Sequence, residues 1–124
     1  MIKLVYCLRR LPELSREEFQ RYWRETHSPL VRNRAPALGI KRYIQVHTLE
    51  SPLNEALRAS RGSEAEIYDG VAELWWENAE ALAAGTATPE GRQVARELFE
   101  DEKRFIDFAR SVVFVAEENP VVDG

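Results

Sequence analysis

Hydrophobic and polar positions along this chain follow the strand period in some segments and the helix period in others. Two segments, residues 15–27 and 89–104, repeat their apolar positions at helical spacing. Four segments predict strands, at residues 2–8, 40–49, 71–77 and 111–116. The resulting order β-α-β-β-α-β predicts a ferredoxin-like α+β fold, in which a four-stranded antiparallel sheet carries its main helices on one face.

The first predicted helix has clear signals at both ends. Ser15 and Glu18 form a capping box, in which each side chain bonds the free backbone N–H of the other residue. Pro29 disfavours helical dihedral angles at Ser28, so we expect the helix to break or kink there. A short second segment then runs to about Gly39.

The remaining segments are less regular. Residues 51–69 are polar and predict a long variable insertion loop with one helical turn after Ser51. Residues 78–84 predict a short helix. Residues 1–117 are expected to form a single domain, and residues 118–124 a tail.

The first, third and last predicted strands have apolar residues at both odd and even positions, so both of their faces are apolar. Two main helices cover only one face of a four-stranded sheet, and a face left to water should alternate clearly between apolar and polar residues. Because an exposed apolar face of this size would be sticky, the pattern predicts a homodimer in which a second copy, related by a two-fold axis, covers it.

Composition narrows the classes of function. The 124 residues are 44% hydrophobic and 31% charged, with a formal net charge of -4, which argues against a nucleic-acid partner. No stretch approaches the roughly 20 apolar residues of a membrane span, and the first residues do not resemble a signal peptide. The one cysteine, Cys7, permits no internal disulfide and is expected in the core. We therefore expect a cytoplasmic protein without a membrane partner.

Several motifs together resemble one known family, the EthD domain family. The most specific of them is Trp23-x-x-x-His27-x-Pro29. The resemblance extends over nearly the whole chain and is carried by residues 14–31, 42–47, 70–76 and 101–107.

The resemblance implies a dimeric α+β barrel, in which two sheets pack face to face. Similar barrels include tetracenomycin-type polyketide cyclases and methylmuconolactone isomerase. In these relatives a pocket lies between helices and sheet, and the chemistry is proton transfer without a metal or an organic cofactor. Other relatives are labelled reductases, after a member of an ether-degrading oxidation system.

Three titratable residues are candidate catalytic groups. His27 lies on the apolar face of the first predicted helix, where the helix end would favour the imidazolium form, and the alternative is a structural histidine. His47 shares a strand face with other polar residues, and that face is either a pocket wall or a solvated rim. Glu73 lies in an apolar strand, as a general base or as one half of an interface ion pair.

Five further residues are candidate substrate-binding groups. They are aromatic or polar side chains that could line a pocket for a planar ligand, although aromatic clusters more often form core. They are Tyr6, Trp23, Tyr43, Gln45 and Trp76.

The leading hypothesis is a cofactor-independent enzyme that cyclises, dehydrates or isomerises a small aromatic, polyketide-like or lactone substrate by proton transfer. We expect no cofactor, because the chain has no G-x-G-x-x-G motif and too few histidines and cysteines for a recognisable metal site. The alternatives are an EthD-type oxidoreductase component of a degradation pathway and a non-enzymatic accessory protein that binds a small organic molecule.

Overall fold

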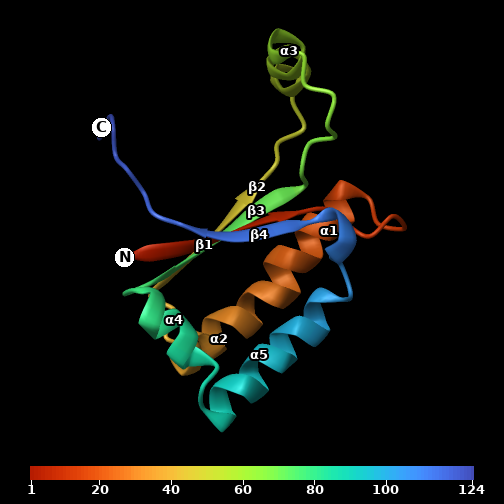
Figure 1. Ribbon diagram of the computed structural model, residues 1–124. Helices are drawn as coiled ribbons and strands as arrows, with labels where there is room; N and C mark the ends of the chain where they lie inside the picture. Colours follow the sequence, from red (N-terminus) through yellow and green to blue (C-terminus); the bar gives the residue numbers. More distant parts are fainter.

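The structure is a computed structural model that describes residues 1–124, and its centre is a four-stranded antiparallel sheet (Figure 1). The strand order is β2-β3-β1-β4, as the split β-α-β arrangement requires. The ferredoxin-like α+β fold predicted from the sequence is therefore confirmed. The strands are β1 (Ile2–Leu8), β2 (Arg42–His47), β3 (Gly70–Trp76) and β4 (Val112–Ala116).

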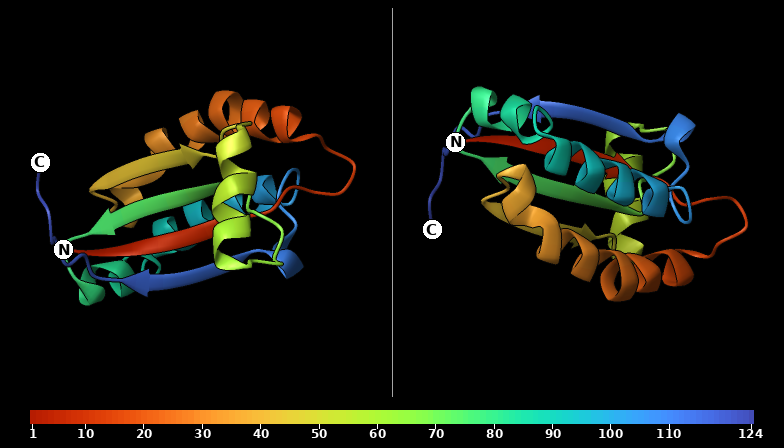
Figure 2. Two further views of the ribbon diagram at one scale, coloured as in Figure 1. Left: turned by 90° about the horizontal axis from the view of Figure 1, so that it is seen from above. Right: turned by 90° about the horizontal axis from the view of Figure 1, so that it is seen from below.

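The long helices cover one face of this sheet (Figures 1 and 2). They are α1 (Arg16–Tyr22), its continuation α2 (Ser28–Leu38), and α5 (Pro89–Glu102). The short helix α4 (Ala79–Gly85) follows β3, and a 3-10 turn (Phe108–Arg110) precedes β4. None of these helices has the length and apolar character that a membrane crossing requires.

The predicted break at Ser28 was wrong, because the helix continues through it as one turn of π-helix (Trp23–His27). Ser28 keeps helical dihedral angles of φ -55° and ψ -47°, and its N–H donates to the carbonyl of Trp23, five residues earlier. The wider turn accommodates Pro29, whose ring has no N–H to give to the preceding turn. Both ends of the π-turn, Trp23 and His27, point into the protein and are buried.

The core between sheet and helices has two parts. The first cluster is Leu8, Phe19, Trp23, Ala72, Phe105 and Ile106, and the second is Val31, Leu38, Val94 and Leu98. Tyr43 and Leu74 on the sheet contact both clusters, so these two side chains mark the place where the clusters meet.

The insertion between β2 and β3 is more ordered than the sequence suggested. In place of one helical turn it contains the ten-residue helix α3 (Pro52–Arg61), which Ser51 caps and Gly62 ends at φ 62°. The sequence indicated the start of this helix at Ser51, but Gly62, a typical helix end, was not used to extend it. The helix stands off the sheet, on the side away from α2 and α5 (Figure 1).

The second face of the sheet carries no helix, which leaves several of its apolar residues open, although Trp75 on this face is buried. Val46, Val112 and Phe114 on this face are 43%, 47% and 48% exposed. Cys7 also lies on this face and is half-buried, so the prediction of a core position was wrong. The side chains of β1 alternate between the two faces, so Cys7 and the preceding Tyr6 point to opposite sides of the sheet.

Candidate functional site

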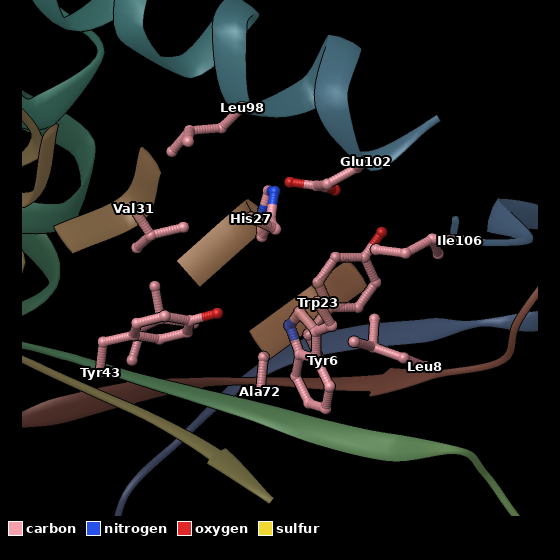
Figure 3. Close-up of a pocket in the computed structure, with 11 residues that line it drawn as sticks. Tyr6, Leu8, Trp23, His27, Val31, Tyr43, Ala72, Leu98, Glu102 and Ile106 are labelled. Atoms are coloured by element: carbon pink, nitrogen blue, oxygen red, sulfur yellow. The ribbon is translucent and has the colours of Figure 1, made fainter. Parts of the chain in front are cut away.

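A cavity of about 70 Å³ lies between the sheet and the helices, at the junction of the two core clusters. Its walls are mostly apolar, and its polar groups come from Tyr6, His27, Tyr43 and Glu102 (Figure 3). The other lining residues are Leu8, Trp23, Val31, Ala72, Leu74, Leu98 and Ile106.

His27 reaches this cavity from the π-turn and is held there by a carboxylate behind it. Its Nδ1 lies 2.7 Å from Oδ2 of Asp101, in the last turn of α5. Because a carboxylate only accepts hydrogen bonds, the proton of the neutral ring is at Nδ1. The other ring nitrogen, Nε2, is then an unprotonated acceptor without a protein partner.

Asp101 is fixed in turn by two further donors. Its Oδ1 accepts hydrogen bonds from the Tyr22 hydroxyl at 2.6 Å and from the Arg104 guanidinium at 3.2 Å. Burial alone would raise the pKa of Asp101, but the hydrogen bonds from Tyr22 and His27 and the nearby positive charge outweigh it and lower this pKa. Asp101 therefore stays ionised and orients the imidazole.

The protonation of His27 differs from the expectation that a helix end would favour the imidazolium. The helix does not end at His27 but continues into α2, so no terminal carbonyls gather beside the ring. Burial lowers the pKa of His27, and this effect exceeds the opposite influence of Asp101. At neutral pH His27 is a neutral base with a carboxylate ready to stabilise its cation.

Glu102 provides a second titratable group on the same cavity, and Figure 3 shows its carboxyl pointing toward the His27 ring. Burial raises the pKa of Glu102 to about 7, against a hydrogen bond with Tyr6 that lowers it. Burial and the neighbouring Glu102 also raise the pKa of Tyr6, which therefore stays protonated. Near neutral pH a large fraction of Glu102 carries a proton that it can donate.

A chain of hydrogen bonds connects the candidates on β2. Gln45 Nε2 donates to the Tyr43 hydroxyl oxygen at 2.8 Å and to the carbonyl of Trp23 at 3.0 Å. The Oε1 atom of Gln45 accepts from Nε2 of His47 at 2.9 Å, and the His47 ring lies against the Trp23 ring with centroids 4.6 Å apart. His47 thus lies behind Trp23 and reaches the cavity only through Gln45 and Tyr43.

Two sequence candidates lie away from the cavity. Glu73 points to the open face of the sheet, where it accepts a hydrogen bond from Lys3 at 2.9 Å, because it alternates with the inward-facing Ala72 and Leu74. Trp76 is on the helix side but beyond the end of the cavity, and its Nε1 donates to the carbonyl of Leu38 at 2.8 Å. The structure therefore brings together Tyr6, Trp23, His27 and Tyr43, with Gln45 and His47 behind them.

Comparison with known proteins agrees with this architecture. The chain matches the EthD domain over residues 11–109. The chain belongs to the EthD domain family. No curated protein is a significant match to it in sequence.

Solved structures of EthD-like fold cover nearly the whole chain. An EthD family protein from Bacillus halodurans is 21% identical with a TM-score of 0.62, and the match covers 96% of this chain and 99% of that one. A dimeric protein of ferredoxin-like fold from Bacteroides fragilis is 9% identical, with a TM-score of 0.58 and coverage of 94% and 95%. SnoaB, a cofactor-independent oxygenase from Streptomyces nogalater, is 14% identical, with a TM-score of 0.52 and coverage of 99% and 97%. At these identities the likeness shows the fold.

Sequence reasoning assigned no role in this EthD domain to Asp101 or Glu102, although both lie in a segment that carries the resemblance. Asp101 follows Val94 and Leu98 at the spacing of one buried helix face, and an acidic residue at such a position needs a partner. That partner, His27, is 74 residues away in the chain. The helical spacing therefore indicated that Asp101 is buried, but it could not identify His27 as its partner.

The EthD domain shows no cluster of three or more histidine, cysteine, aspartate or glutamate side chains that could hold a metal ion. Function without a metal, flavin or nicotinamide remains a prediction.

Proposed function

We propose that this EthD-domain protein is a cofactor-independent enzyme that transfers protons on a small uncharged organic molecule bound between helices and sheet. The observation that supports this most is the arrangement of His27 and Glu102 on one apolar cavity. One group is neutral and backed by a carboxylate, and the other has a pKa of about 7. Titratable groups whose environments push their pKa values in opposite directions are typical of acid–base pairs.

The two groups have complementary roles in this proposal. Nε2 of His27 takes a proton from a carbon of the substrate, and Asp101 stabilises the imidazolium that forms. Glu102 gives its proton to another atom of the substrate, which for an isomerisation is a second carbon or an oxygen. For a dehydration Glu102 protonates the departing hydroxyl, which leaves as water. Either reaction balances without an oxidant or a reductant.

The cavity walls narrow the class of substrate. No lysine or arginine lines the cavity, so an anionic substrate would find no counter-charge beside Glu102. A cavity of about 150 Å³ holds benzene, so about 70 Å³ takes only a few heavy atoms unless the walls move. We therefore favour small carbonyl compounds, and single-ring lactones or aromatics only where the walls move, over multi-ring polyketides.

The homodimer is also a proposal, in which the two bare sheet faces pack together. The half-exposed apolar residues of that face support it, as does the fold shared with a protein described as dimeric. The cytoplasmic location expected from the sequence is likewise a proposal.

Hydrogen exchange provides a test that does not require the natural substrate. Small ketones and single-ring lactones are incubated with the protein in D2O, and loss of their C–H signals is followed by proton NMR. The wild type should accelerate exchange of at least one compound, and His27→Gln should slow it by roughly 10²–10⁴-fold, the usual contribution of general acid–base catalysis. His47→Gln, which changes the histidine outside the cavity, is the matched control and should lose much less. Equal rates in wild type and His27→Gln would contradict the proposal and favour a binding protein.

A further inference from the structure

The insertion between β2 and β3 forms an arm, defined as residues 48–69, which carries α3 above the bare face of the sheet. Seen along the sheet, α3 stands on the side opposite to α2 and α5 (Figure 1). Seen from above, it crosses the end of the sheet, transverse to the strands (Figure 2, left). Any molecule that covers the bare face must therefore meet the arm.

The base of the arm is held in place by several specific interactions. Asp69, which is 2% exposed, accepts hydrogen bonds from Arg10 at 2.6 Å and from Arg16 at 2.9 Å. The guanidinium of Arg9 lies 4.1 Å from the centre of the Tyr68 ring and donates to two backbone carbonyls of the arm. The base of the arm is thus part of the fold, so a partner that binds α3 does not have to order this base.

The arm exposes apolar side chains that nothing in the same chain covers. Leu53 and Leu57, one helical turn apart on α3, are 69% and 59% exposed, and Leu49 just before the helix is 74% exposed. No residue of α3 is buried. A helix with an uncovered apolar stripe is typical of an interaction surface.

We propose that the arm clasps a second copy of this chain, with Leu53 and Leu57 packed against the opposite end of the partner's sheet. This inference rests on the proposed sheet-face dimer. A stable interface uses about 20–30 residues on each side, whereas the bare face has three from each of four strands, and one of these, Trp75, is already buried. The arm lies next to that face and adds the ten residues of α3. The face residues are Lys3, Val5, Cys7, Arg42, Ile44, Val46, Val71, Glu73, Trp75, Val112, Phe114 and Ala116.

The arm and the C-terminal segment, residues 117–124, leave two arrangements for a two-fold dimer. They rise at opposite ends of the bare face (Figure 1). A two-fold axis across the strands therefore brings each arm to the partner's C-terminal segment, whereas an axis along the strands would bring two arms to one end.

One end of α3 offers a positive charge and apolar groups that match those of the C-terminal segment. Arg58 in the last turn of α3 pairs with Glu55, whereas Arg61 pairs with no carboxylate of its own chain, and the C-terminal segment carries three acidic residues. The segment also exposes Val121 and Val122, at 85% and 90%. Opposite charges beside apolar groups on both sides are suited to pairing between two copies of the chain.

The first experiment measures the dimer dissociation constant by analytical ultracentrifugation over a range of concentrations. The double variant Leu53→Ser/Leu57→Ser should weaken the dimer by at least 10-fold. Both side chains are exposed, so the fold should be retained, as circular dichroism can verify. Ala56→Ser/Ala59→Ser, at exposed positions of the same helix, is the matched control and should leave the constant unchanged.

The second experiment locates the contact by oxidative cross-linking in a Cys7→Ala background. A mixture of chains carrying Leu57→Cys and Val122→Cys should give a disulfide-linked heterodimer. Leu57→Cys chains alone should give little cross-linking, and efficient Leu57–Leu57 linkage would overturn the arm-to-tail contact.

The outcomes separate the two proposals. A wild type that stays monomeric up to high micromolar concentration would overturn both the sheet-face dimer and the clasp. A wild-type dimer that the double leucine variant leaves unchanged would overturn the clasp alone. Neither result depends on the exchange assay, so proton-transfer chemistry at His27 is judged separately.

Discussion

Glu102 provides a test of the site that needs no substrate, because its burial has a measurable consequence for stability. Burial raises its pKa from the ordinary value of 4.5 to about 7. Between these pH values the folded protein holds a proton that the unfolded chain has released, so the stability due to this group decreases as pH rises. The loss begins near pH 4.5 and is complete above about pH 7.

The magnitude follows from the two pKa values. At roughly 1.4 kcal/mol for each pH unit, the difference corresponds to at most about 3.5 kcal/mol. Glu102→Gln keeps the shape of the side chain and an acceptor for Tyr6 but has no ionisable proton. The variant should therefore match the wild type near pH 5 and be more stable by about 2–3 kcal/mol at pH 8.5.

The measurement is urea unfolding followed by tryptophan fluorescence at several pH values between 5 and 9. Protein concentration is held constant, because dimerisation would couple stability to concentration. Glu100→Gln is the control, since Glu100 is exposed on the same helix and pairs with Lys103 at the surface. His27 also titrates in this range, but it is common to both proteins and largely cancels in their difference. A difference that stays within about 0.5 kcal/mol from pH 5 to 9 would refute the reasoning.

Three further predictions concern the same region. The exchange rate should rise with pH as His27 loses its proton, below pH 6.5, and fall above about pH 7 as Glu102 ionises; a rate that stays constant from pH 6 to 9 would contradict these roles. Asp101→Asn should lower the pKa of His27 further and reduce exchange by roughly 10²–10⁴-fold, since the amide no longer favours the Nδ1–H tautomer or the imidazolium; NMR titration of the ring and the exchange assay check both effects. Gly70→Ala would place a methyl group 2.4 Å from the Trp23 ring and should lower the free energy of unfolding by about 1–3 kcal/mol, with altered tryptophan fluorescence; an unchanged melting curve would contradict the packing.

The sequence by itself determined the fold class and most of the elements. The capping box at Ser15 and Glu18 is formed as the sequence indicated, with bonds of 2.9 and 3.0 Å. The order of strands and helices followed from periodicity, because both the period of 2 and the period of 3.6 arise from backbone geometry within one element. The bare second face of the sheet was likewise visible in strands that are apolar on both parities.

Two predictions from local sequence signals were wrong, one at Pro29 and one in the insertion between β2 and β3. Pro29 argued for a break, but a single π-turn absorbed it and kept Trp23 and His27 on the inner side. Capping at Ser51 and Gly62 was present in the sequence, yet the polar composition of the insertion concealed the helix between them.

Only the tertiary structure decided which polar residues form the site. The carboxylate behind His27 comes from the far end of α5, and the neighbouring residue of that helix, Glu102, meets Tyr6 from β1. Glu73 and Trp76, which the sequence offered equally well, lie on the other face and beyond the cavity. Protonation depends on burial and on partners distant in the chain, and neither is fixed until sheet and helices have packed together.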